Sequence, residues 1–233
     1  EPIADHLGSA YLRYSFTKGT RQEVDAVVEW LGLAPGMRVL DVGCGPGRHV
    51  LELASRGITT HGIDISRTFV DIARSNAVVN ATFERMDARH MTFDAEFDAV
   101  ICLCQGAFGL MTANGNDLDV LRGIRRALKP GGRLALSAFS SYFAVKYHGA
   151  ASFDADSGVS HEVTEVKDES GRATEVDLWT GCYTPRELRM LMDKVDMTVD
   201  HIYSVEPGAY LPAPPTVESP EYLLIASATP FRR

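Results

Sequence analysis

A run of closely spaced glycines stands between an apolar stretch and a helical pattern. Gly43, Gly45 and Gly47 follow the apolar residues that end at Val42. Glycines allow a sharp turn and let a ligand approach the main chain. The first turn of a helix also offers unpaired N–H groups to an anionic group. The pattern therefore predicts a ligand-binding turn between a strand and a helix.

Acidic side chains follow the next two predicted strands. Asp64 closes the second strand, where a carboxylate can accept hydrogen bonds from both hydroxyls of a ribose. Asp87 follows the third strand, where it could bond an adenine amino group. Both have plainer interpretations, because Asp64 could cap a helix beside Ser66 and aspartate is common in loops.

The glycine spacing separates two classes of nucleotide-binding loop. The dinucleotide fingerprint GxGxxG would place its third glycine where this chain has Arg48. The third glycine is instead Gly47, which gives GxGxG. This spacing disfavours an oxidoreductase that uses NAD.

The elements around this loop alternate between strand and helix, which predicts an α/β fold with a doubly wound, mostly parallel sheet. Capping-box patterns at Thr20–Glu23 and Thr184–Glu187 mark the starts of two helices. Strands are predicted at residues 38–42, 58–63, 81–85, 97–103, 133–137, 198–204 and 221–227. Helices are predicted from residue 20 to the turn at 35–36, and at 47–56, 66–79, 118–128 and 184–195.

The alternation breaks between residues 139 and 183. Residues 162–167 and 174–179 alternate in polarity on either side of a turn, which predicts an antiparallel hairpin. We interpret 139–183 as a lid inserted over the carboxyl edge of the sheet. With an N-terminal arm at 1–19, the whole chain, 1–233, is expected to form one domain.

Composition narrows the classes of partner. The formal net charge is −8 and 45% of the residues are hydrophobic. An acidic chain without a basic cluster is a poor nucleic-acid binder, and no apolar run is long enough for a membrane span. We see no secretory leader and expect a cytoplasmic protein with reduced cysteines. No metal site is expected from the cysteine spacing.

Five segments together resemble the ordered motifs of class I S-adenosylmethionine-dependent methyltransferases: VLDVGCGPGRH, GIDIS, RMDAR, FDAVICLCQGAFG and LKPGGRLALS. They cover about residues 37 to 138. The resemblance implies a seven-stranded sheet with one antiparallel strand and S-adenosyl-L-methionine as cofactor. The cofactor contacts that we expect on this basis are Tyr14, Thr17, Asp41, Gly43, Gly45, Gly47, Asp64, Ile65, Asp87, Ala88, Leu103 and Gln105.

Three residues are candidates for catalytic roles beside the transferred methyl group. Gln105 could orient the acceptor, and His148 or His161 could act as a general base. The plainer interpretation of either histidine is a side chain that is solvated or satisfied in the core. An aromatic cluster just before His148 could wall an apolar pocket or pack the lid onto the sheet: Tyr142, Phe143 and Tyr147.

The acceptor is left open by these motifs. The segment 103–106, Leu-Cys-Gln-Gly, lacks the Asn-Pro-Pro-Tyr-like pattern of enzymes that methylate amino groups of nucleic acids. We therefore expect methyl transfer to nitrogen or oxygen of a small molecule. The alternatives are a tRNA or protein methyltransferase, or a non-catalytic cofactor-binding protein. The proline-rich loop at 207–220 could shape the pocket or a homodimer contact.

Overall fold

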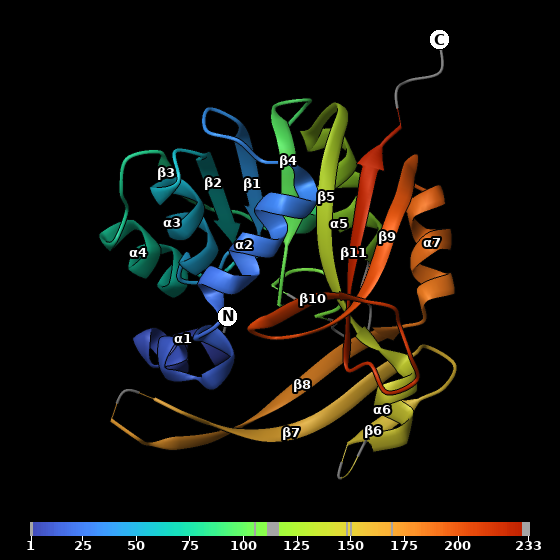
Figure 1. The fold of residues 1–233 in the computed structure, drawn as a ribbon. Helices are drawn as coiled ribbons and strands as arrows, with labels where there is room; N and C mark the ends of the chain where they lie inside the picture. Colours follow the sequence, from blue (N-terminus) through green and yellow to red (C-terminus); the bar gives the residue numbers. More distant parts are fainter. Residues whose placement is uncertain are drawn as a thin grey trace.

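The structure is a computed structural model that describes residues 2–104, 106–110, 117–147, 149, 151–168 and 170–229. A twisted sheet runs through the molecule with helices on both faces (Figure 1). Its strand order is β10-β9-β11-β5-β4-β1-β2-β3. The strands are β1 Arg38–Val42, β2 Thr59–Asp64, β3 Ala81–Arg85, β4 Phe97–Cys102, β5 Leu128–Ser140, β9 Met197–Glu206, β10 Ala209–Ala213 and β11 Glu221–Ala228.

The strand directions confirm the expected α/β sheet. β1 to β5 pair in parallel, whereas β11 runs antiparallel to both β5 and β9. The sheet also has an edge strand, β10, that the sequence did not predict. It pairs antiparallel with β9 and lies in the segment 207–220 that we expected to be a loop. Pro212 is tolerated there because an edge strand does not need every N–H as a donor.

The helices begin close to the predicted residues. They are α1 Pro2–Leu7, α2 Thr20–Leu31, α3 Arg48–Ser55, α4 Arg67–Ser75, α5 Asp117–Ala127, α6 Ser141–Tyr147 and α7 Pro185–Asp193, with 3-10 turns η1 Gly8–Arg13, η2 Ser15–Thr17 and η3 Ala88–His90. Helix α4 ends four residues earlier than expected. Asn80 then has a φ of 72°, so the chain has already left the helical region before β3 begins.

One predicted capping box is confirmed and the other is wrong. In α7 the Thr184 hydroxyl accepts the Glu187 N–H, and the Glu187 carboxylate accepts the Thr184 N–H. In α2 the N-cap is Gly19, and the Thr20 hydroxyl donates to a carbonyl outside the helix. Glu23 cannot cap this helix because its carboxylate is bound by side chains of α3.

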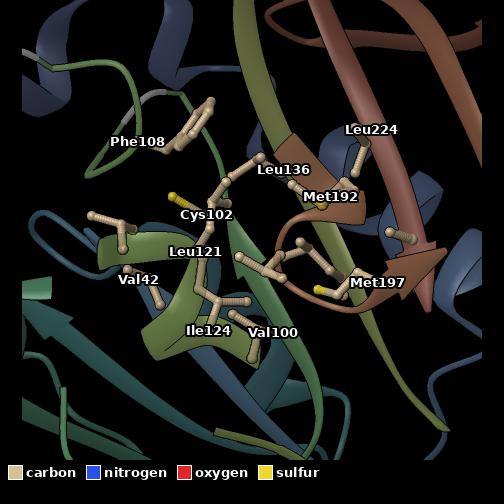
Figure 2. Packing of buried hydrophobic residues seen from close by; sticks show 14 of the residues in the cluster. Val42, Val100, Cys102, Phe108, Leu121, Ile124, Leu136, Met192, Met197 and Leu224 are labelled. Carbon is tan, nitrogen blue, oxygen red and sulfur yellow. The ribbon is translucent and has the colours of Figure 1, made fainter. Parts of the chain in front are cut away.

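Apolar cores cover both faces of the sheet. Figure 2 shows Leu121 and Ile124 of α5 and Met192 of α7 packed among residues such as Val100 and Leu136 of the strands. On the opposite face, α2 packs against alternate residues of β1, β4, β5 and β11. Each large side chain that is buried in this way contributes roughly 1.5–3 kcal/mol. The strands therefore hold their carboxyl ends in fixed positions.

The predicted lid hairpin is present at the carboxyl edge of the sheet (Figure 1). It consists of β7, Val159–Lys167, and β8, Ala173–Tyr183, with the short strand β6, Ser152–Asp154, on its outer side. The end of β8 pairs in parallel with the end of β5, with Cys182 opposite Phe139. This pairing anchors the lid to the main sheet.

None of the helices within the described ranges combines the length and the apolarity that crossing a membrane requires. The four cysteines all lie in those ranges and are free thiols, as expected. Cys102 and Cys104 do not share a face, because Cys104 leaves the strand with a φ of 50°. Cys102 joins the core under α5, and Cys104 packs against the core under α2.

Candidate cofactor and acceptor site

A cavity of about 380 Å³ lies at the carboxyl edge of the sheet, where the glycine loop meets the lid. Ligands of doubly wound sheets bind at this edge. A second hollow of about 220 Å³ lies at the opposite edge, around the amino ends of β1 and β2, and is far from the predicted site. The cavity at the carboxyl edge is lined by Ile3, Gly43, Ile63, Asp64, Ile65, Met86, Asp87, Ala88, Arg89, Gly106, Ala107, Leu110, Asp117, Val120, Asp177, Leu178 and Trp179.

The three loop glycines have different roles. All three have positive φ, at 77°, 54° and 86° for Gly43, Gly45 and Gly47. A Cβ on Gly43 would lie 2.2 Å from the backbone of Gly106, and one on Gly47 would lie 2.7 Å from the Phe83 ring. A Cβ on Gly45 would meet nothing closer than 4.0 Å. Packing therefore requires glycine at the outer positions, whereas the middle position has open space beside it.

Asp64 is positioned by the loop that it serves. Its Oδ2 accepts the Gly45 N–H and its Oδ1 accepts the Ser66 N–H, each at 2.8 Å. Burial raises the pKa of this carboxyl above its usual range. Each carboxylate oxygen has two acceptor positions, so Asp64 can still accept hydroxyl groups from a ligand in the cavity. This geometry fits the ribose contact that we expected.

Asp41 is a buried carboxylate whose hydrogen bonds are incomplete among the described residues. Its side chain is buried under the loop, and no described residue bonds its Oδ2. Burial raises the pKa of Asp41 to about 7. A buried acceptor without a partner is costly, and a nearby cationic ligand group would remove that cost. S-adenosylmethionine carries two such groups, an ammonium and a sulfonium, so the residues present fit the cofactor that the resemblance implies.

The adenine side of the predicted site also lines the cavity. Ile65, Asp87 and Ala88 all contribute to its wall, together with Met86. The Asp87 carboxylate is hydrogen-bonded by Arg89, which lowers its pKa to about 2. Asp87 is therefore ionised at neutral pH and can only accept hydrogen bonds, as an adenine amino group requires.

Six of the expected cofactor residues that the structure describes lie off the cavity wall: Tyr14, Thr17, Asp41, Gly45, Gly47 and Leu103. Thr17 is buried and donates its hydroxyl to carbonyls of its own segment, at Leu12 and Tyr14. The Tyr14 hydroxyl accepts the N–H of Lys167 in the lid at 3.4 Å. Leu103 packs in the core under α2. The N-terminal arm does reach the cavity, but through Ile3 of α1, which no sequence pattern singled out.

Of the three candidate catalytic residues, one lies among the described residues. Gln105 and His148 lie outside the described residues. His161 lies on β7, where its Nε2 bonds the Asp177 carboxylate at 2.7 Å and its ring stacks on Trp179 with 3.9 Å between centroids. Asp177 and Trp179 line the cavity, so His161 stands directly behind its wall. The aromatic rings of α6 are not among the lining residues.

Sequence reasoning missed the anchor between the lid and the loop after β4. The Tyr183 hydroxyl donates to Asp117, whose other oxygen accepts the Gly109 N–H at 3.3 Å. The Tyr183 ring also stacks on Phe108. No sequence pattern links these residues, because Asp117 and Tyr183 are 66 positions apart.

Sequence reasoning also missed a buried polar group on the α2 side. Glu23 Oε2 accepts Nη1 of Arg48 at 2.5 Å and Nε2 of His49 at 2.8 Å. Arg48 Nη2 also contacts the Cys104 sulfur at 2.7 Å. Potential metal ligands from Glu23, His49 and Cys104 lie within 4.8 Å of one another. The Arg48 guanidinium already supplies these groups with the positive charge that a metal ion would otherwise bring.

The family profile that matches this chain is that of a methyltransferase domain, over residues 39–132. Among curated proteins, the cypemycin N-terminal methyltransferase of a Streptomyces species is 36% identical over 99 residues, which are 42% of this chain and 40% of that protein. The ubiquinone biosynthesis O-methyltransferase of Alkalilimnicola ehrlichii is 30% identical over 122 residues, which are 50% and 47% of the two chains.

The chain thus spans about half the length, or less, of the curated relatives it matches. Among solved structures, the CcbJ methyltransferase of Streptomyces caelestis has a TM-score of 0.75 over 90% of this chain and 89% of its own. At 15% identity, this likeness concerns the fold alone. The profile match covers the glycine loop, Asp64 and Asp87, and the fold extends the similarity over the remaining strands. Residues 39–132 therefore match a methyltransferase domain, and the chain as a whole has the fold of class I S-adenosylmethionine-dependent methyltransferases.

Proposed function

We propose that this chain transfers a methyl group from S-adenosylmethionine to nitrogen or oxygen of a small molecule. The observation that carries the proposal is the cavity that joins Gly43, Asp64 and Asp87 to the lid. When bound, the cofactor supplies a methyl group on a positively charged sulfur. Catalysis then rests largely on holding an acceptor in line with that group.

The residues around the cavity divide between the parts of the cofactor. Asp64 accepts the ribose hydroxyls, and Asp87 and Ala88 meet the adenine ring. Asp41 lies under the glycine loop and pairs with positive charge at the methionine end. The open space beside Gly45 admits the cofactor next to the main chain.

The lid supports a small acceptor. Leu178 and Trp179 of β8 form part of the cavity wall opposite the glycine loop. Of the five charged residues on the cavity wall, four are aspartates, and Arg89 is already paired with Asp87. Such a wall repels the phosphates of a nucleic acid. A covered, acidic cavity favours a compact metabolite over tRNA.

Of the catalytic candidates that the sequence suggests, His161 is the one that lies among the described residues. Asp177 holds one ring nitrogen and Trp179 holds the plane of the ring.

The test is calorimetric binding of S-adenosylhomocysteine to the wild-type chain and to Asp64→Ala. Loss of a charged hydrogen-bond acceptor costs about 1.5–3 kcal/mol, so the affinity should fall by roughly 10- to 100-fold. The matched control is Asp71→Ala, which removes an exposed carboxylate from the neighbouring helix α4 and should leave affinity unchanged. The proposal would be refuted if the wild-type chain did not bind S-adenosylhomocysteine, or bound NADH in its place.

A further inference from the structure

A polar layer interrupts the apolar core on the α2 face of the sheet. In β11, Leu223 and Ile225 belong to this core, so Glu221, two residues before Leu223, faces the same side. Glu221 pairs with Phe139 at the carboxyl end of β5, because β11 runs antiparallel. Tyr210 comes from the edge strand β10 and belongs to the same core. The first residue of β11 thus lies at the edge of the sheet where ligands bind.

The charges in this layer do not balance. Glu23 is fully paired, since Arg48 and His49 bond one of its oxygens and the Gly208 N–H bonds the other at 2.9 Å. Burial lowers the pKa of His49 and keeps it neutral. The guanidinium of Arg48 is thereby neutralised by Glu23 alone. The Arg48 charge opposes the rise in pKa of both Asp41 and Glu221, but neither carboxyl forms an ion pair with a described residue.

Three polar atoms of this layer have no hydrogen-bond partner among the residues that the structure describes. They are Oδ2 of Asp41, Oε1 of Glu221 and the hydroxyl of Tyr210, and each side chain is at most 3% exposed. The other side of the Glu221 carboxyl is bonded by Ser137. Buried polar atoms are rarely left unpaired, so each one requires an explanation.

These groups lie close enough to influence one another. The charges of Glu221, Cys104 and Glu23 help raise the pKa of Tyr210, after burial itself, while Arg48 opposes them. The charge of Glu221 likewise contributes to raising the pKa of Cys104. Cys104 directly follows the buried Leu103 at the end of β4, so Glu221 and Tyr210 lie near the carboxyl end of that strand, where the resemblance places the transferred methyl group.

We propose that Glu221 and Tyr210 form the acceptor site and that the acceptor is a protonated amine. This inference rests on the proposed function. Asp41 pairs with the positive charge of the cofactor. Oε1 of Glu221 is then available to pair with a second cation. The Tyr210 hydroxyl supplies a neutral partner for another polar atom of the acceptor. Tyr210 lies on the edge strand β10, whose one neighbouring strand is β9, and its backbone forms two hydrogen bonds with Gln22 of α2.

The same pairing prepares the amine for reaction. One N–H bond of the ammonium breaks, its electron pair stays on nitrogen, and the proton forms an O–H bond with Oε1 of Glu221. The nitrogen then has the lone pair that methyl transfer requires. Burial raises the pKa of Glu221 to about 7, despite the opposing effects of Ser137 and Arg48, so it is a better base than an exposed glutamate.

The test compares benzylammonium chloride with benzyl alcohol by calorimetry on the chain saturated with S-adenosylhomocysteine at pH 7.5. The wild-type chain should bind the amine at least tenfold more tightly than the alcohol. Glu221→Gln should abolish this preference, and Tyr210→Phe should weaken amine binding several-fold. The matched control is Glu206→Gln, an exposed glutamate at the end of β9. Circular dichroism melting of each variant checks that it folds.

Two results would overturn the inference. A wild-type chain without a preference for the amine would mean that the unpaired atoms hold only buried water. A preference that survives in Glu221→Gln would place the amine elsewhere. In both cases intact binding of S-adenosylhomocysteine would leave the proposed function standing, whereas loss of that binding in the wild-type chain would refute the proposed function itself.

Discussion

Glu23 and Glu221 are both buried glutamates on the same face of the sheet, yet their surroundings differ. Glu23 accepts hydrogen bonds from Arg48, His49 and the backbone of Gly208. Glu221 has one bonded side and one oxygen without a partner among the described residues. Burial favours the neutral form of both carboxyls, but the partners of Glu23 hold its pKa below the usual value. The pKa of Glu221 rises to about 7.

We interpret Glu23 as part of an ion-pair network that stabilises the fold, and Glu221 as part of a binding site. The bonds of Glu23 join α2, α3 and the turn between β9 and β10, so they are complete without a ligand. Oε1 of Glu221, by contrast, gains a hydrogen-bond partner only when a ligand binds. The two glutamates should therefore respond oppositely to the same substitution.

The largest effect is expected for Glu23→Gln. The amide cannot satisfy both Arg48 and His49 and leaves a buried guanidinium uncompensated, so the free energy of unfolding should fall by about 3–5 kcal/mol. Urea denaturation at pH 7 measures this change. Glu29→Gln, exposed on the same helix, is the control and should lie within about 0.5 kcal/mol of wild type. An equally small loss for Glu23→Gln would show that the hydrogen bonds of Glu23 do not stabilise the fold.

A smaller effect of opposite sign is expected for Glu221→Gln without ligand. A carboxyl whose folded-state pKa is raised holds its proton better in the folded chain, so wild-type stability is lost as pH rises from about 4.5 to about 7. The variant removes this loss and should be more stable at pH 8 by up to about 3 kcal/mol. At pH 4 the two chains should agree. Urea denaturation across this range measures the difference.

Asp41 titrates in the same window and remains in the variant, so some decline of stability with pH should persist. Equal slopes in both chains would show that Glu221 already has a partner. A variant that is less stable at pH 8 would show the same.

The smallest effect is expected for Tyr210→Phe. Its hydroxyl is buried and has no bonding partner within the described ranges, so removing it sacrifices no protein hydrogen bond. The free energy of unfolding should stay constant or rise by at most about 1 kcal/mol. Thermal melting detects the shift, and Tyr222→Phe is the contrast, because the Tyr222 hydroxyl bonds Ser140 at 2.8 Å. Equal losses in both variants would contradict the unpaired state of Tyr210.

Sequence patterns predicted the part of the site that is built from consecutive residues. The bounds of β1 and β3 agree with the expected ones, and the glycine loop, Asp64 and Asp87 lie at the cavity or beside it. The reason is that turns, caps and strand alternation depend on neighbours along the chain. The capping box at Thr20 was wrong because a distant partner took Glu23 away from the helix end.

The sequence by itself determined the parallel part of the sheet, its glycine loop and the resemblance to methyltransferases, since glycine spacing and strand patterns are local properties. Only the tertiary structure decided which buried carboxylates are paired. Glu23 bonds Gly208 across 185 positions, and Glu221 reaches the α2 face because β11 enters the sheet between β5 and β9 in one register. Such contacts follow from the order and register of strands, and no short stretch of sequence encodes them.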